Sequence, residues 1–250
     1  MVTSAELATY CEELLAVAAF EDYCPNGLQV EGTRPVRRLV TGVTASLALI
    51  EAAIAAEADA LLVHHGWFWK GESPCLIGLK GRRARALISS GASLLAYHLP
   101  LDAHPELGNN RQLAERLGIE APEPNAAGRG LVWRGRLPEP LEGEAFALRV
   151  AAALGRVPLR IPGRGAPLTT IAWCTGAAQG FITEVAALGV DAYLSGEISE
   201  QTTHLARELG LDYFAAGHHA TERLGIQALG EHLAARFGLE HRFLDIDNPA

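Results

Sequence analysis

Two stretches of the sequence repeat the same order of predicted strands and helices. Each begins with an apolar strand that carries a Thr-Gly pair, and in each an aspartate (Asp59, Asp191) opens the next strand, 17 residues after Gly42 and 15 residues after Gly176. The repeat predicts an internal duplication, with two pseudo-symmetric α/β units whose parallel strands are joined by right-handed crossovers. The predicted strands span residues 38–44, 59–63, 92–97, 170–176, 191–194 and 213–216, and the helices between them span 46–58, 81–90, 181–188 and 203–209.

The segment between the two stretches has a different composition. Residues 119–168 contain seven prolines and several glycines, which favour short strands and one helix over 144–154. We therefore predict a first α/β repeat over residues 1–120 and a second over 121–250, with a Pro/Gly-rich insert at 121–169. The C-terminal segment could cross back to the first domain.

Composition limits the classes of function that the chain can have. The 250 residues are 49% hydrophobic, which is enough for a sizeable core. The net charge of −8 argues against general nucleic-acid binding. The four cysteines form no CxxC pair, which argues against a zinc ribbon or a disulfide framework and favours a reducing compartment. With no targeting sequence and no apolar run long enough to cross a bilayer, we expect a cytoplasmic protein that does not enter membranes.

Two adjacent histidines follow the second strand of the first stretch. His64 and His65 stand where the predicted strand runs out into a glycine-broken loop. Neighbouring side chains on a regular strand point apart, but a turning backbone lets both imidazoles aim at one spot. Asp102 follows the third strand in a similar way, and ligands of open α/β sheets gather at the carboxyl ends of strands. If the two units face each other, one site can form between them.

A second pair of candidate ligands opens the last predicted helix. His218 and Glu222 are four residues apart and share one helical face, which His219 does not. With the residues of the first stretch they make three imidazoles and two carboxylates, more than one tetrahedral zinc ion needs and suited to two bridged ions. Paired ions activate water at neutral pH and act as Lewis acids. The predicted cofactor is two divalent metal ions per chain, and zinc, iron, manganese and nickel all suit this ligand set.

A family resemblance is carried by four blocks of sequence: Leu-Val-His64-His65-Gly, His98-Leu-Pro-Leu-Asp102-Ala-His, Ser-Gly-Glu197-Ile-Ser-Glu-Gln-Thr and Ala-Ala-Gly-His218-His-Ala-Thr-Glu222-Arg. Over nearly its whole length the chain resembles the YbgI-type dinuclear metal-binding family (Ngg-interacting-factor-like), which includes GTP cyclohydrolase I homologues. The resemblance implies two intertwined, duplicated α/β domains with mainly parallel sheets and a hexameric ring. It also implies two metals bound by His64, His65, Asp102, His218 and Glu222.

Two further residues are candidates for proton transfer. His98 and His104 flank Asp102 and could relay protons or orient a ligand carboxylate, although an ordinary surface or core histidine is the more frequent case for both. Glu197 takes the place that the duplication assigns to His65, although a solvated loop acid is an equal alternative. Some other polar residues nearby are better explained as ordinary surface or core residues, namely His104, His219 and the arginines Arg82, Arg83 and Arg85.

Different classes of function are compatible with such a site. A metal-dependent hydrolase would attack a cyclic amide or amidine, or the purine ring of a nucleotide such as GTP, with His98 or Glu197 moving the proton. A non-catalytic chaperone or insertase would hold or deliver metal instead. A metal-stabilised scaffold is weaker, because a mixed His/carboxylate pair is usually left partly open. We favour the hydrolase slightly, and the sequence alone leaves open whether the protein is an enzyme.

Overall fold

The computed structural model describes all 250 residues, which divide into two compact units. Unit 1 is Met1–Leu107 with Gly225–Asp247, and unit 2 is Gly108–Leu224 with Asn248–Ala250. The chain therefore passes from one unit to the other three times. The sequence placed the division at residue 120, whereas the chain first leaves unit 1 after Leu107, and Gly225–Asp247 return to unit 1.

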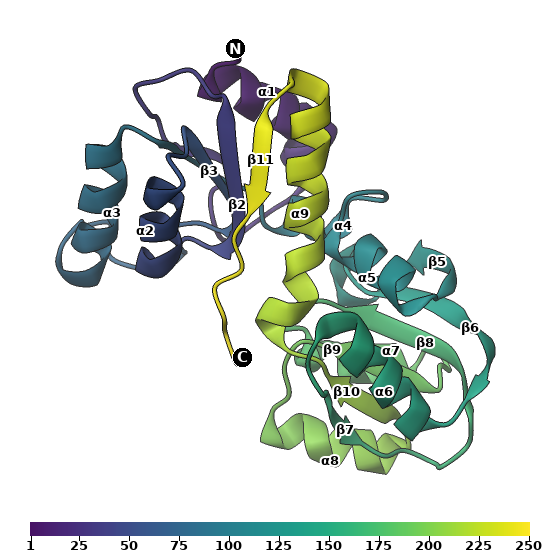
Figure 1. Ribbon diagram of the computed structural model, residues 1–250. Coiled ribbons are helices and arrows are strands. Elements are labelled where there is room, and N and C mark those ends of the chain that lie inside the picture. Colours follow the sequence, from purple (N-terminus) through teal and green to yellow (C-terminus); the bar gives the residue numbers. More distant parts are fainter. The chain divides into compact units, whose positions relative to one another are not determined.

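Unit 1 contains a five-stranded sheet in the order β1-β4-β3-β2-β11 (Figure 1). β2 (Arg38–Thr44), β3 (Ala60–His65) and β4 (Ser93–Ala96) are parallel, as the alternation of strands and helices predicts. β1 (Gly27–Val30) runs antiparallel to β4. β11 (Glu240–Phe243) is parallel to β2 and has no counterpart in the sequence prediction, because its four residues alternate between exposed and half-buried and include only one apolar side chain.

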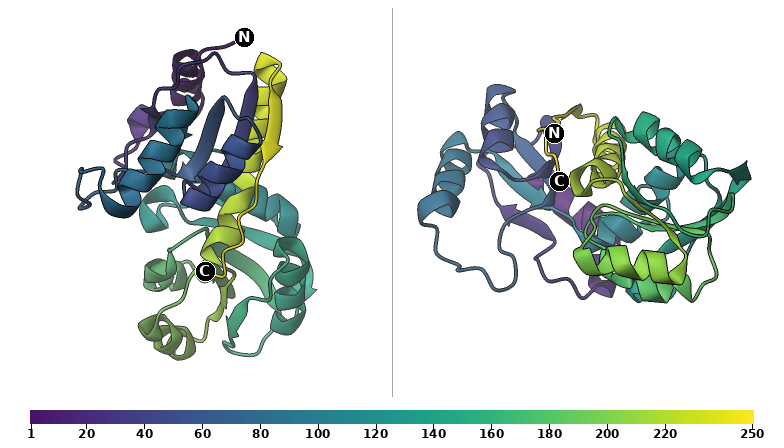
Figure 2. Two further views of the ribbon diagram at one scale, coloured as in Figure 1. Left: turned by 60° about the vertical axis from the view of Figure 1, so that its left-hand side comes forward. Right: turned by 90° about the horizontal axis from the view of Figure 1, so that it is seen from below.

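Helices cover both faces of the unit 1 sheet (Figures 1 and 2). They are α1 (Ser4–Leu14), α2 (Leu47–Ala55), α3 (Gly78–Ser90) and the part of α9 (His218–Phe237) from Gly225 onward. Leu61 of β3 packs in the cluster formed with α2 and α3, whereas its neighbour Leu62 packs in the cluster formed with α1 and α9. β3 is therefore buried on both faces, which explains its continuous run of apolar residues.

Unit 2 repeats this arrangement in a six-stranded sheet with the order β5-β6-β8-β9-β10-β7. β8 (Leu168–Cys174), β9 (Ala192–Ser195) and β10 (Asp212–Ala215) are parallel, like β2, β3 and β4. β7 (Leu159–Ile161) is antiparallel to β10, just as β1 is antiparallel to β4. The predicted duplication is therefore present in the strand order as well as in the sequence.

The Pro/Gly-rich segment supplies half of the strands in the second sheet. β5 (Glu120–Pro124), β6 (Trp133–Leu141) and β7 all lie within it, and α6 (Gly143–Leu154) matches the predicted helix. The segment is thus integral to unit 2, and every antiparallel pair of this sheet involves it. Its prolines are tolerated because β5 is an edge strand and because Pro138 and Pro140 lie where the pairing of β6 with β8 is irregular.

Helices also cover both faces of the unit 2 sheet. They are α5 (Asn109–Leu117) and α6 on one face, and α7 (Ile182–Ala186) and α8 (Glu200–Leu209) on the other. Trp173 and Cys174, adjacent in β8, pack in these two separate clusters. None of the helices in the structure is both long enough and apolar enough to cross a membrane.

The two aspartates that marked the repeat occupy equivalent places. Asp59 Oδ2 accepts hydrogen bonds from the backbone N–H groups of Arg37 and Arg38, at 3.1 and 3.0 Å. Asp191 Oδ2 accepts hydrogen bonds from the backbone N–H groups of Thr169 and Thr170, at 2.9 and 2.8 Å. Each carboxylate therefore ties the start of one strand to the start of the next.

The register of the strands corrects one detail of the predicted repeat. Ala60 follows Asp59 and pairs with Leu39, and Ala192 follows Asp191 and pairs with Ile171. Counted from these pairs, Gly176 corresponds to Thr44. Gly42, which the sequence had matched to Gly176, lies inside β2, so that match was wrong by two residues.

Candidate metal centre

β3 ends in the two histidines, which are paired residues of the strand and not loop residues as the sequence predicted. His65 pairs with Thr44 of β2, so the backbone pairing of the sheet continues to the end of the histidine pair. His64 is fully buried and His65 is half-buried. Their ring centroids lie 4.6 Å apart, so both imidazoles are close enough to bind the same ion or two neighbouring ions.

Each of these imidazoles has its Nδ1 atom next to an oxygen. His64 Nδ1 lies 2.9 Å from the carbonyl oxygen of Tyr97, which can only accept, so Nδ1 carries the hydrogen and Nε2 keeps the lone pair. His65 Nδ1 lies 3.2 Å from Thr44 Oγ1. His64 Nε2 lies 3.4 Å from Asp102 Oδ1. His64, His65 and Asp102 thus form a buried set of nitrogen and oxygen atoms in unit 1.

His98 lies beside this set, at the start of a short helix, α4 (Leu99–Ala103), in a stretch that the sequence suggested was a loop. Its ring centroid is 5.1 Å from that of His64 and 5.6 Å from that of His65. The three histidines present nitrogen atoms within 4.8 Å of one another, a spacing that a metal ion could use.

Asp22 holds His98 in place and was missed by the sequence analysis. Its two carboxylate oxygens lie 3.0 and 3.2 Å from His98 Nδ1. Burial raises the pKa of Asp22, but hydrogen bonds from His98, Asn26 and the backbone of Leu99, together with the charge of His98, outweigh burial and bring the pKa below its usual range. The only sequence signal was the turn around Pro25, flanked by polar residues that can bond to backbone groups.

The aromatic run after β3 divides between core and site. Trp67 is buried and its Nε1 atom donates a hydrogen bond to the carbonyl of Ala45 at 3.2 Å. The Trp69 ring instead lies 5.5 Å from His65 and 5.3 Å from His98, between ring centroids. Tyr23 packs on Trp69 and on His98. Trp69 and Tyr23 therefore form an aromatic wall beside the histidines of unit 1.

In unit 2, the first turn of α9 brings His218 and Glu222 together as the four-residue spacing predicts. His218 Nε2 lies 3.1 Å from Glu222 Oε2, and His218 Nδ1 lies 2.7 Å from Glu197 Oε1. Gln179 Nε2 donates to the other oxygen of Glu197 at 3.3 Å. Burial lowers the pKa of His218, but the carboxylates of Glu222 and Glu197 outweigh it and raise the pKa to about 9.

Two glycines make room for this group. A Cβ atom at Gly176 would collide with the Glu222 carboxylate, and Gly176 also has a φ of +69°, which favours glycine. A Cβ atom at Gly196 would lie 2.7 Å from the Cα atom of His218. In the sequence Gly176 stands out only as a marker of the repeat, and nothing near it in the chain indicates its place beside Glu222.

The remaining candidates have other surroundings. His104 ends α4, and its Nδ1 atom accepts hydrogen bonds from the backbone N–H groups of Glu106 and Leu107 at 3.2 and 3.0 Å. Burial lowers the pKa of His104, consistent with a neutral ring that caps this turn. His219 is buried in the first turn of α9. The arginines at positions 82, 83 and 85 lie on α3, the first and last of them exposed.

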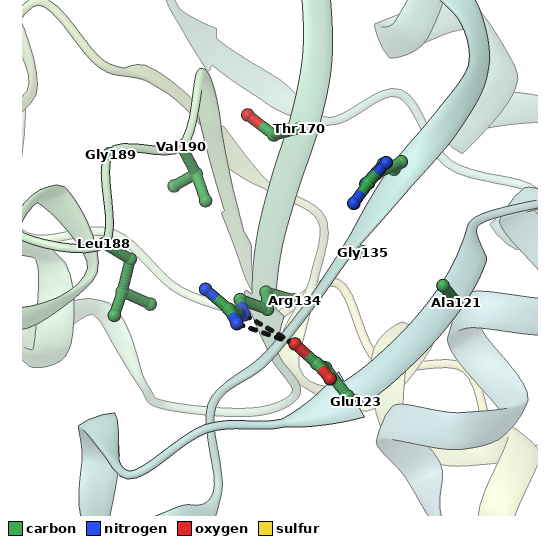
Figure 3. Close-up of a pocket in the computed structure, with 9 residues that line it drawn as sticks. Ala121, Glu123, Arg134, Gly135, Thr170, Leu188, Gly189 and Val190 are labelled. Carbon is green, nitrogen blue, oxygen red and sulfur yellow. Dashed lines mark hydrogen bonds and ion pairs between the residues drawn. The ribbon is translucent and has the colours of Figure 1, made fainter.

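A pocket of about 290 Å³ in unit 2 lies on the β5-β6-β8 side of the sheet (Figure 3). Arg134 and Glu123 lie next to each other in its lining and form an ion pair at 2.7 Å, so their charges compensate. The lining also includes Arg136, Thr170 and the turn at Gly189. None of the predicted metal ligands lines this pocket.

The chain is similar in sequence to one family of known proteins over nearly its whole length. Residues 2–249 match the family model described as Duf34/NIF3 (NGG1p interacting factor 3). The "GTP cyclohydrolase 1 type 2 homolog" of Allochromatium vinosum is 64% identical over 245 residues, covering 98% of this chain and 96% of that protein. The protein of the same name from Pseudomonas aeruginosa is 57% identical over 249 residues, covering 98% of both.

A solved structure is also close to this chain. The protein ybgI, described as of unknown function, is 50% identical, and the two chains superpose over 100% of each with a TM-score of 0.96. The match of the family model over nearly the whole length and the identity to these relatives agree with one another. The chain therefore belongs to the Duf34/NIF3 (NGG1p interacting factor 3) family.

Proposed function

We propose that this protein binds two divalent metal ions and uses them to hydrolyse a cyclic amide or amidine, or the purine ring of a nucleotide. The proposed metal ligands are His64, His65, Asp102, His218 and Glu222. The names of the relatives support the GTP cyclohydrolase-like choice of substrate. Trp69 and Tyr23 are aromatic surfaces beside the histidines of unit 1 on which a purine could stack.

One observation carries the metal-binding part of the proposal. All three proposed histidine ligands have Nδ1 next to an oxygen, namely the Tyr97 carbonyl, the Thr44 hydroxyl and the Glu197 carboxylate. Metal-binding histidines typically donate one ring N–H to such a partner, which fixes the ring and presents the other nitrogen to the ion. Here that nitrogen is Nε2 in each case. Ligands of nitrogen and oxygen without sulfur suit zinc, iron, manganese or nickel.

The chemistry divides between the ions and the protein. Two such ions, when bound, activate water and polarise the bond that the water attacks. His98 then moves a proton through Nε2, because Asp22 engages its Nδ1 atom and holds the ring in one orientation. Glu197 keeps His218 oriented through Nδ1 and is the second candidate for proton transfer. Trp69 and Tyr23 limit the access of solvent to His98.

Elemental analysis of gently purified protein, before and after mild chelation, is the first test. Two ions per chain that survive chelation support the proposal and justify a turnover screen with GTP and with cyclic amides. One retained and one labile ion, with no turnover of any nucleotide, would favour a metal chaperone or insertase instead. If reconstitution with any of the four metals leaves the protein empty, the five-ligand site is wrong.

Assembly and location are part of the same proposal. We infer that the protein assembles as a homohexameric ring, as the family resemblance implies. We also infer that it is cytoplasmic, because its cysteine usage suits a reducing compartment. None of the four cysteines forms a disulfide in the structure, and Cys75 is exposed. Measuring the mass of the native protein tests the hexamer, and a monomer or dimer at micromolar concentration would contradict it.

A further inference from the structure

A second group of ligand-capable atoms lies on the other side of His98 in unit 1. We propose that Asp22, Cys24 and His98 form a third metal site, one that takes a borderline-soft divalent cation such as Zn²⁺ or Fe²⁺ with Cys24 as a thiolate. Thiolate ligands favour these ions over Mg²⁺ and Ca²⁺. The inference uses only residues of unit 1 and stands whether or not the proposed hydrolase function is correct.

The spacing of the three side chains fits a tetrahedral ion. Asp22 Oδ1 lies 3.5 Å from Cys24 Sγ and 3.0 Å from His98 Nδ1, and the three ligand atoms all lie within 4.8 Å of one another. Bonds of about 2.0–2.3 Å to zinc place neighbouring ligands of a tetrahedron roughly 3.3–3.8 Å apart. The Asp22–Cys24 edge already has such a length, and the Asp22–His98 edge has to lengthen by a few tenths of an ångström.

The Asp22 carboxylate is already turned to serve such an ion. Its Oδ2 atom accepts hydrogen bonds from the backbone N–H of Leu99 and from Asn26 Nδ2, both at 3.0 Å. Both oxygens lie near His98 Nδ1, and Oδ1 is the one that also lies 3.5 Å from the Cys24 thiol and 3.3 Å from the Cys24 backbone nitrogen. The side chains of Asp22 and His98 are only 3% and 6% exposed, so the ligand atoms are oriented and shielded from water before a metal arrives.

The position of His98 suggests what the third site does. Its ring lies against His64 and His65, which are proposed ligands of the paired ions, while its Nδ1 atom faces Asp22. An ion on Nδ1 is thus separated from those ligands only by the His98 ring. This is a suitable position for a metal ion that is exchanged between solvent and the paired site. When the ion binds, the Cys24 thiol proton leaves to solvent and the Nδ1 hydrogen of His98 moves to Nε2.

Cobalt(II) titration of the metal-free full-length protein tests the third site. A Co²⁺–thiolate pair gives a charge-transfer absorption in the near ultraviolet that nitrogen and oxygen ligands do not give. We expect this band in the wild type, its loss in Cys24→Ser, and at least about tenfold weaker binding at this site in Asp22→Asn. Cys174→Ser removes another buried cysteine, in unit 2, and should leave the band unchanged.

Two further measurements keep the inference separate from folding defects and from the paired site. X-ray absorption of zinc-loaded wild type needs no variant and should show sulfur at about 2.3 Å from zinc. Glu222→Ala, which removes a proposed ligand of the paired ions only, should keep the thiolate band even if all activity is lost. Absence of both the band and the sulfur shell in metal-saturated wild type would overturn the third site, as would a band that survives Cys24→Ser.

Discussion

Units 1 and 2 are built on the same three parallel strands, but they present different side chains where these strands end. In both, an antiparallel strand flanks the third parallel strand and an aspartate joins the first two strands. Counted from those aspartates, His65 corresponds to Glu197. The chain after β4 enters the short α4 with Asp102, whereas the chain after β10 enters the long α9 with His218 and Glu222.

This difference shows which part of a duplicated fold is free to change. The buried faces of the strands must stay apolar in both units, since each strand packs against helices on both sides. Residues just beyond the strand ends are under no such demand. Unit 1 has come to supply mostly imidazoles there, and unit 2 one imidazole with two carboxylates.

The strongest way to break the comparison is to remove one proposed ligand from each unit. If both units contribute to the same two ions, His65→Ala and His218→Ala should each weaken metal binding by more than about 100-fold, the upper figure for loss of a mere supporting residue. Metal content after dialysis measures this. His204→Ala is the control, because His204 forms a similar four-residue pair with Glu200 on the exposed face of α8. Loss of metal from one variant only would mean that a single unit holds the ions.

Gly176→Ala tests why unit 2 has glycine where unit 1 has Thr44. The methyl group would collide with Glu222, and the left-handed backbone would be strained by about 1–2 kcal/mol. Gly189→Ala is a matched control, with a φ of +70° and open space around its Cβ position. We expect both variants to lose stability in thermal unfolding, but only Gly176→Ala to lose metal as well. Equal metal content in the two variants would show that Glu222 does not need this space.

Glu197→Gln sharpens the comparison at the position equivalent to His65. The amide keeps the shape but removes the charge that orients His218 through Nδ1. Metal affinity should fall by about 10-fold, the lower end of the range for such partners. Isothermal titration with zinc gives the value, and His218→Ala should exceed it. An unchanged affinity for zinc would mean that Glu197 does not support the site and is an ordinary solvent-exposed acid of the loop.

The aspartates should give the smallest effects on metal binding, and similar effects on the stability of their own units. Asp59→Ala and Asp191→Ala each leave two backbone N–H groups without their acceptor, at a cost of about 1–3 kcal/mol, with Asp59 at the upper end because it is more buried. Hydrogen exchange read on peptides of each unit should localise each loss to its own unit. Changes in both units from either variant would contradict the parallel roles.

Acid should remove the contribution of Asp191 to stability. Hydrogen bonds from Thr169 and Thr170 outweigh burial and lower the folded-state pKa of Asp191 below its unfolded value. Its contribution to stability is therefore complete above about pH 4 and is lost as pH falls through the folded pKa. Wild type and Asp191→Asn should converge in stability in strong acid, whereas a constant difference between them would show that protonation of Asp191 plays no part.

Much of the fold could be predicted from the sequence because it depends on local patterns. The apolar runs at residues 38–44 and 59–63 and the four-residue spacing of His218 and Glu222 each express a constraint within a few neighbouring residues. The predicted strand 38–44 coincides with β2, and the helix over 144–154 differs from α6 by one residue. The family resemblance was likewise carried by short blocks.

The contacts that the sequence could not provide join residues far apart in the chain. Asp22 meets His98 across 76 positions, and β11 pairs with β2 only because the chain returns to unit 1 after α9. No local pattern marks either event, since an aspartate near a turn and a short segment with one apolar residue in four look ordinary in isolation. The sequence by itself determined the duplicated α/β frame and the candidate ligand residues, because periodicity and spacing are local. Only the tertiary structure decided which oxygen each imidazole faces, because that depends on how separate strands and helices pack.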